Sequence, residues 1–311
     1  MTTALFTHPA CQNHLTPAGH PEQVARLQAI EAALAAPAFN ALQRHKAPLG
    51  TLEQIRKGHS KVYYDRIEAA CPTTGLTQLD GDTSMSPGSF EAARRAVGGC
   101  VAAVDTVMAG DAQNAFVACR PPGHHAEKAK PMGFCLFSTV AIAAIHAADA
   151  HDLMRVAVID FDVHHGNGTQ DVLWHESRVK FASSHQMPLF PGSGGRHQKG
   201  AFGQILNIPL EEGTGGEVMR EAYDHEVFPA LRDYDPDLIL VSAGFDAHSR
   251  DPLAGLHWDT LDFSWLAHRI CDLADECCDG RVVSSLEGGY DLEALADSVE
   301  AYVDVMMERG E

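Results

Sequence analysis

Short apolar runs alternate with amphipathic stretches over the last two thirds of the chain. The runs predict buried strands at 115–119, 156–161, 179–183, 238–242 and 281–286. Between and after them, apolar residues at helical spacing predict helices over 138–150, 168–174, 217–231, 260–278 and 291–307. Strands that alternate with helices predict an α/β fold, a mostly parallel central sheet flanked by helices on both faces.

The first third of the chain is less regular. Residues 14–22 predict a loop, and a helix is expected over 22–36 with Val24, Leu27, Ile30 and Leu34 on one face, ended by Pro37. Residues 38–88 are mixed and punctuated by Pro and Gly. A longer helix over 89–109 ends before Gly110, a C-cap signal. Because no repeat, low-complexity tract or long linker interrupts the chain, one domain is predicted.

Polar residues follow five of the predicted strands, at the end where ligands bind in parallel α/β sheets. The five segments are 120–125, 162–164, 183–185, 244–248 and 287–290. An ordinary parallel sheet has such segments after one or two strands. Five of them indicate a shared active site.

The segment 156–169 has the highest concentration of candidate functional residues, because its apolar run is followed by acids, histidines and glycines. Side chains alternate along a strand, so Asp160 and Asp162 are predicted to point the same way, with His164 continuing that register. Asp162 and His164 form an O/N/O ligand set with Asp246. Catalytic zinc commonly takes three such ligands, and two carboxylates neutralise the dication. Fe²⁺ or Co²⁺ also suits this set.

Two histidines and a tyrosine are candidates for the chemistry beside the metal. His124 and His125 can transfer protons near neutral pH, with Asp160 and Asn167 available as partners for their second ring nitrogens. Tyr290, in a Gly-Gly-Tyr turn, can donate its phenol to a developing oxyanion. Taken singly, a buried His or Asp at a strand end is more often structural, and only the combination favours catalysis.

Composition excludes some classes of partner. The chain is 45% hydrophobic and 21% charged, which is typical of a globular protein, and no apolar run approaches the length of a membrane span. The formal charge of −19 argues against nucleic acid or an anionic membrane as the main partner. The start of the chain lacks the layout of a secretion signal, so a cytoplasmic location is predicted. None of the eight cysteines lies in a C-x-x-C pair, so a cysteine zinc site is not expected.

Seven blocks, in order, give the chain a family resemblance: 120–126, 133–135, 160–170, 190–194, 244–248, 251–253 and 287–290. With them the chain resembles the zinc-dependent histone deacetylases and deacetylase-like amidohydrolases of the arginase/deacetylase fold. The motifs Pro-Pro-Gly-His-His and His-His-Gly-Asn-Gly-Thr are similar to those of the class II branch of this family. The resemblance implies that residues 1–311 form one histone deacetylase-like catalytic domain.

The resemblance also implies a role for each residue of the site. Asp162, His164 and Asp246 would hold Zn²⁺. His125 would be the general base and then the general acid, held by Asn167 where class I relatives carry Asp. His124 would assist electrostatically, paired to Asp160, and Tyr290 would polarise the acyl carbonyl. A structural K⁺ would lie near Asp160, Asp162, His164, Ser183 and Ser184.

The implied substrate site is a narrow tunnel for an acyl-lysine stem. Phe134 and Phe190 would form its walls and Gly133 would help to line it, although two phenylalanines alone are more simply core residues. Leu253 stands where polyamine-selective relatives carry an acid, which favours a neutral rim. Asp82 is a candidate rim acid or a solvated turn residue, and His20 is a candidate for the entrance.

Three functions therefore compete. The first is a zinc amidohydrolase that removes acetyl or a related acyl group from lysine in a protein or peptide. The second has the same chemistry on a small acyl amide, such as an acetylpolyamine or a secondary metabolite. The third is a non-catalytic binding module, which would normally have lost a metal ligand or the tyrosine. A homo-oligomer is compatible with each of them.

Overall fold

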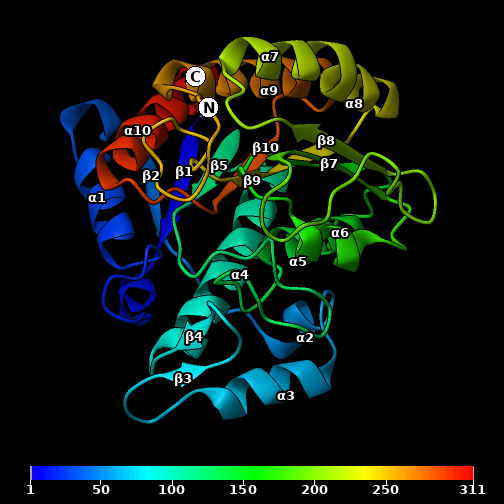
Figure 1. The fold of residues 1–311 in the computed structure, drawn as a ribbon. Coiled ribbons are helices and arrows are strands. Elements are labelled where there is room, and N and C mark those ends of the chain that lie inside the picture. The colour runs from blue at the N-terminus through cyan, green and yellow to red at the C-terminus, as the bar shows by residue number, and fades with distance from the viewer. Residues whose placement is uncertain (1, 311) are drawn as a thin grey trace.

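The computed structural model describes residues 2–310 and is built on an eight-stranded sheet in which every pairing is parallel (Figure 1). The strand order is β2-β1-β5-β10-β9-β6-β7-β8. The strands are β1 (Thr3–Thr7), β2 (Gln43–Lys46), β5 (Asn114–Val117), β6 (Val156–Asp160), β7 (Val179–Gln186), β8 (Ile205–Leu210), β9 (Leu238–Ala243) and β10 (Val282–Leu286). The α/β class with a parallel sheet, predicted from the sequence, is confirmed.

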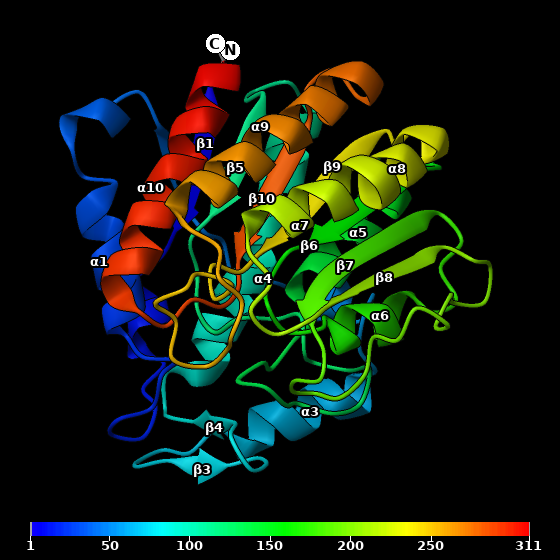
Figure 2. The same ribbon diagram turned by 45° about the horizontal axis from the view of Figure 1, so that its top comes forward.

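Helices cover both faces of this sheet (Figures 1 and 2). One layer holds α1 (Ala25–Ala33), α7 (Gly216–Ala222), α8 (Phe228–Tyr234), α9 (Thr260–Cys277) and α10 (Leu292–Arg309). The other holds α4 (Ser89–Met108), α5 (Thr139–Ala150) and α6 (Asn167–Leu173). The short α2 (Leu52–Ile55), α3 (Lys61–Ala70) and the antiparallel pair β3 (Thr77–Gln78) and β4 (Ser84–Met85) lie together below these layers in Figure 1. Strands packed on both faces explain the nearly continuous apolar runs in the sequence.

Several elements differ from the sequence prediction. The first helix begins at Ala25 rather than 22, because Glu22 is buried in an ion-pair cluster before the helix starts. It ends at Ala33, before the predicted end at 36. The helix expected over 217–231 is interrupted by a π-helical segment, Tyr223–Val227. Strands β1, β2 and β8 are not predicted by the hydrophobic pattern of the sequence. Strand β2 is a polar, largely exposed edge strand, so it carries no hydrophobic alternation.

The order of strands decides where polar residues gather. Strands β5, β10, β9, β6 and β7 are consecutive neighbours in the sheet, and they carry the five polar segments singled out in the sequence. Four of these segments follow their strands, whereas residues 183–185 lie within β7, which continues to Gln186 instead of ending at 183 as predicted. Because parallel strands end at the same edge, those segments meet there. Within residues 2–310, no helix is long and apolar enough to cross a membrane.

Candidate active site

The segment after β6 leaves the sheet earlier than its sequence pattern suggests. The strand ends at Asp160, and residues 161–164 are irregular. The prediction that strand alternation continues through Asp162 and His164 is therefore wrong: bends in the backbone, not the pleat, aim these side chains. An irregular backbone here allows both residues to face the neighbouring strand β9.

Asp162, His164 and Asp246 lie together as a possible ligand set. Their candidate ligand atoms all lie within 4.8 Å of one another. The Nδ1 atom of His164 is 3.2 Å from Oδ1 of Asp162 and 3.1 Å from Oδ2 of Asp246. Backbone N–H groups orient both carboxylates, because Val163 donates to Oδ1 of Asp246 and Gly288 donates to Oδ2 of Asp162. These bonds leave one face of the cluster for a cation.

The charge of this cluster fits a divalent metal. Asp162 and Asp246 are both buried, and within the described part of the chain neither has a Lys or Arg in ion-pair contact. Burying a carboxylate without a cation is costly, so the pair calls for positive charge. Burial lowers the pKa of His164, but its hydrogen bonds to both carboxylates outweigh burial and raise that pKa to about 10. Two carboxylate oxygens and one imidazole nitrogen suit Zn²⁺, Fe²⁺ or Co²⁺.

His125 is held as a neutral base. Its Nδ1 donates to Oδ1 of Asn167 over 2.8 Å, and Nδ2 of Asn167 donates to Oε1 of Glu127 over 2.8 Å, which orients the amide. This pattern leaves the lone pair of Nε2 available. Burial, together with the charges of His124 and His164, lowers the pKa of His125 well below its usual value.

His124 is held in the opposite state. Its Nδ1 lies 3.0 Å from Oδ2 of Asp160, and its ring centroid is 4.0 Å from that of His125. Burial alone would lower the pKa of His124, but Asp162 and Asp160 raise it well above its usual value. Two adjacent imidazoles with pKa values pushed apart can act as a charged group and a base.

Tyr290 is positioned by Arg26, a residue not predicted to belong to the site. Burial raises the pKa of Tyr290 well above its usual value, so the phenol keeps its proton. The guanidinium of Arg26 lies 4.9 Å from the centre of the Tyr290 ring and donates to the main-chain oxygens of Gly289 and Glu287, each over 2.6 Å. The signal in the sequence was an arginine four residues before Ile30, on the apolar face of the first predicted helix, and the structure shows that this arginine is fully buried.

Two further buried acids support the loop that carries the histidines. The carboxylate of Glu287 accepts from the backbone N–H groups of Gly123 and His124, over 2.7 and 3.2 Å, and burial raises its pKa to about 7. Glu22 binds the fully buried Arg120 through both carboxylate oxygens. These contacts join segments that are far apart in sequence, so no local motif could reveal them.

A cavity of about 220 Å³ opens onto these groups. His125 and His164 are buried, whereas Phe190 is 40% exposed, so the histidines form its inner end and Phe190 its rim. The ring of Phe190 lies edge-on to His125 at 5.1 Å, and the ring of Phe134 lies edge-on to Tyr290 at 5.8 Å. The lining consists of Asp82, His125, Gly133, Phe134, His164, Leu189, Phe190, Leu253 and Tyr290.

The turn at Gly133 and Phe134 brings backbone against the ring of His125. Both residues have positive φ, at 55° and 67°. A Cβ atom on Gly133 would lie 2.4 Å from Cδ2 of His125, so only glycine allows this approach. Oδ1 of Asp82 accepts from the N–H of Gly133 over 3.2 Å, and Oγ1 of Thr83 accepts from the N–H of Phe134 over 3.0 Å. A bulky residue at positive φ is strained, and such strain is common at functional sites.

His20 stands behind the cavity wall. Its ring packs edge-on against Phe134 at 4.7 Å, and its Nε2 lies 3.1 Å from the main-chain oxygen of Asp82. It is not among the residues that line the cavity. The structure therefore places His20 as a support for Phe134 and Asp82.

Ser183 and Ser184, the serines predicted to lie near a potassium ion, are on β7. Ser183 pairs in register with Asp160 on β6. The Oγ of Ser183 lies 3.0 Å from Nδ1 of His185, and the Oγ of Ser184 lies 2.8 Å from the hydroxyl of Tyr223. Since both hydroxyls already have partners, a cation here would rely on main-chain oxygens and the Asp160 carboxylate.

Known proteins resemble the chain over most of its length. Residues 20–306 match the family model described as "Histone deacetylase domain". A chloroplastic histone deacetylase 10 of Oryza sativa subsp. japonica is 41% identical over 300 residues, which cover 90% of this chain and 68% of that protein. A histone deacetylase-like amidohydrolase of Pseudomonas aeruginosa is 38% identical over 278 residues, covering 88% and 73%. The crystal structure of the HDA15 HD domain superposes with a TM-score of 0.94 at 31% identity, covering 99% of this chain and 88% of that one.

Proposed function

The chain belongs to the histone deacetylase domain family and is a hydrolase of amide bonds, and we propose that it removes acetyl or a related acyl group from the ε-amine of lysine. One arrangement carries this proposal: a narrow cavity ends on His125, His164 and Tyr290 and is walled by Phe134 and Phe190. Aromatic walls suit a lysine stem of four methylenes. The inner groups suit the amide at its end.

We propose that Asp162, His164 and Asp246 hold Zn²⁺, with Fe²⁺ or Co²⁺ as chemically compatible alternatives. The buried carboxylates without a Lys or Arg partner support this assignment. Bound there, the metal would polarise the acyl carbonyl and lower the pKa of a nearby water.

The protein side chains would then move the proton and stabilise charge. Nε2 of His125 takes the proton of the attacking water and later delivers it to the leaving amine, while Asn167 holds Nδ1. His124, charged and paired to Asp160, offsets negative charge that develops on the oxygen atoms bonded to the reacting carbon. Tyr290 donates its phenol to the acyl oxygen as it becomes an oxyanion.

The cavity rim favours acyl-lysine over an acetylpolyamine. Leu253 lines the cavity, so no carboxylate at that position attracts a second ammonium group. A small neutral acyl amide remains the alternative substrate of the same chemistry. A purely binding role is disfavoured, because the ligand set, both histidines and Tyr290 are all present.

A comparison of kcat/KM for the zinc-loaded enzyme tests the substrate assignment. Acetyl-lysine peptide, longer acyl-lysine peptide and acetylpolyamine are assayed in parallel, with a hydroxamate as the inhibition control. We expect an acyl-lysine peptide to give the highest kcat/KM, and Leu253→Glu to improve acetylpolyamine relative to peptide. Higher kcat/KM for the acetylpolyamine in the unaltered enzyme would overturn the proposal.

We further propose that residues 1–311 form one catalytic domain and that K⁺ is bound by Asp160, Asp162, His164, Ser183 and Ser184. The match over residues 20–306 supports the first statement. The register of Asp160 with Ser183 supports the second. The cytoplasmic location stays a prediction, because the Oryza sativa relative is named chloroplastic.

A further inference from the structure

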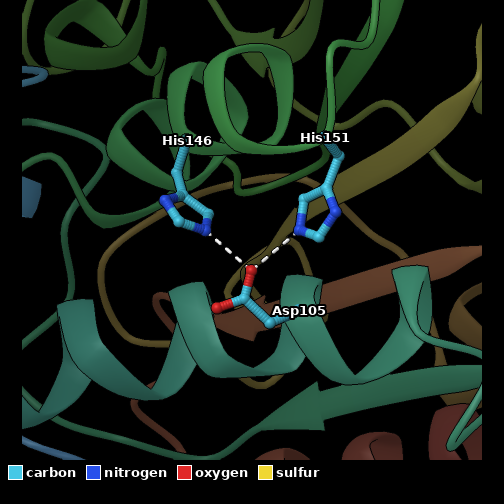
Figure 3. Close-up of side chains that lie close together, drawn as sticks. All are labelled: Asp105, His146 and His151. Carbon is cyan, nitrogen blue, oxygen red and sulfur yellow. Dashed lines mark hydrogen bonds and ion pairs between the residues drawn. The ribbon is translucent and has the colours of Figure 1, made fainter.

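A second group of metal-ligating side chains joins helices α4 and α5. Figure 3 shows Asp105 on α4 facing His146 on α5 and His151 just after it. Nε2 of His146 lies 2.7 Å from Oδ1 of Asp105, and Nε2 of His151 lies 2.8 Å from the same oxygen. Two imidazoles on separate turns thus converge on one carboxylate oxygen.

The donor set is that of a transition-metal site. Two imidazole nitrogens and one carboxylate oxygen lie within 4.8 Å of one another. Imidazole binds Zn²⁺, Ni²⁺ and Cu²⁺ well, and one carboxylate adds charge without favouring Ca²⁺ or Mg²⁺. Tetrahedral zinc with bonds of about 2.0–2.2 Å places its ligand atoms roughly 3.3–3.6 Å apart, so each nitrogen would move away from the carboxylate oxygen by about 0.5–0.9 Å.

The surroundings leave the group free for an ion. In the part of the chain that the structure describes, Asp105 makes no ion pair with Lys or Arg, and its side-chain hydrogen-bond partners are the two histidines. The side chains of His146 and His151 are 12% and 25% exposed, so an ion can reach them while their rings stay partly fixed. A surface groove of about 470 Å³ includes His146 in its lining and has room for water on the ion.

The group is separate from the candidate active site. Asp105 lies in the last turns of α4, which leads into the start of β5, and His151 precedes the start of β6. The active site lies at the other end of these parallel strands. An ion bound here would link α4 to α5 without contacting the substrate.

We propose that Asp105, His146 and His151 form a second divalent metal site, selective for zinc and related transition ions, that ties α4 to α5. The excess of acidic residues, with a formal charge of −19, favours cation binding at the surface. Occupancy stabilises the folded state, since the ligands come together only there.

Zinc titration of the tag-free, zinc-loaded enzyme tests the site by calorimetry. We expect one further equivalent to bind with a micromolar dissociation constant and to raise Tm by a few degrees. The double variant His146→Gln/His151→Gln is expected to weaken this second binding by at least about tenfold, with deacylase activity unchanged. Asp105→Asn, which keeps the shape of the side chain, is expected to weaken it as well.

The matched control is His175→Gln/His197→Gln, which removes two exposed histidines outside the group. It is expected to keep the second equivalent. Cu²⁺ titrated into the same proteins gives an independent readout, because its electron paramagnetic resonance spectrum reports two nitrogen ligands only where both His146 and His151 remain. If the enzyme binds no second equivalent of zinc, or if the control variant loses that binding to the same extent, the three residues only form hydrogen bonds between the helices and the proposal is overturned.

Discussion

His125 is held by an amide and not by a carboxylate, since its Nδ1 donates to Oδ1 of Asn167 over 2.8 Å. An amide oxygen stabilises an imidazolium less than a carboxylate does. The charged pair of the site is instead His124 with Asp160. The adjacent histidines are thereby divided between a base that can accept a proton and a cation that stays charged.

Asn167→Asp is expected to shift the pH dependence of kcat/KM. A carboxylate at this position raises the pKa of His125, and the base must be unprotonated to act, so the acidic limb moves to higher pH by about one unit. The pH profile measures this shift. Glu127→Gln, which retains the amide at 167, is the control and is expected to move the limb little. If the acidic limb of the kcat/KM profile stays at the same pH in Asn167→Asp, His125 is not the base.

Tyr290→Phe is expected to lower kcat by about 10²- to 10³-fold with little change in KM, because the lost donor acts on the oxyanion. The ring contacts with Phe134 and Arg26 remain, so fold and metal content are retained. Tyr302→Phe is the matched control. It removes a buried hydroxyl that bonds Ser284 over 3.0 Å, and should cost about 1 kcal/mol of stability but no kcat. Full activity of Tyr290→Phe would exclude the proposed role.

The polar segments that follow the strands could be predicted, because they depend on local sequence. Each apolar run ends in residues whose chemistry is visible in the chain, and parallel topology sends them to one edge. The order of the strands could not be predicted locally. Strand β10 lies between β5 and β9, which puts Glu287 beside Gly123, 164 residues earlier in the chain.

The residues that were missed act through long-range contacts. Arg26 reaches the main-chain oxygens of Glu287 and Gly289 across more than 260 residues of sequence. No spacing rule connects these segments. The predicted register of His164 was wrong for a local reason. Strand β6 ends at Asp160, and hydropathy does not mark the residue at which a strand stops.

Asp162→Ala is expected to lose the catalytic metal, because it removes one of two carboxylates that compensate the dication. Zinc per protein is measured by elemental analysis after dialysis, in the His146→Gln/His151→Gln background so that the second site does not contribute. Asp171→Asn, a substitution outside the ligand set, is the control and should keep one equivalent. One equivalent of zinc in Asp162→Ala would refute the ligand assignment.

Gly133→Ala is expected to abolish most activity, because its Cβ would lie 2.4 Å from Cδ2 of His125. Gly75→Ala is the matched control, since Gly75 also has positive φ, at 71°, but a Cβ there meets nothing within 4 Å. Each variant should lose about 1 kcal/mol of stability through backbone strain, and Gly133→Ala should lose more, because its Cβ displaces the buried ring of His125. Only Gly133→Ala should lower kcat/KM as well. Equal activity in the two variants would show that the close approach has no catalytic importance.

His59 is expected to make stability depend on pH. Burial lowers its pKa from 6.5 to about 4. Its Nε2 accepts the N–H of Ser138 over 2.9 Å, and its Nδ1 donates to the main-chain oxygen of Lys128 over 3.2 Å. The unfolded chain therefore binds a proton at higher pH than the folded one. The stabilisation is complete above pH 6.5 and is lost as the pH falls toward 4.

Urea unfolding at pH 7.5 and 4.5 measures this contribution. Between these values the native enzyme should lose about 2–3 kcal/mol more than His59→Gln, which cannot titrate. Acid effects of other groups, including metal release, are common to both proteins and cancel in the difference. His175→Gln, which removes an exposed histidine, should lose as much as the native enzyme. Equal acid sensitivity of His59→Gln and the native enzyme would mean that His59 is protonated at the same pH in both states.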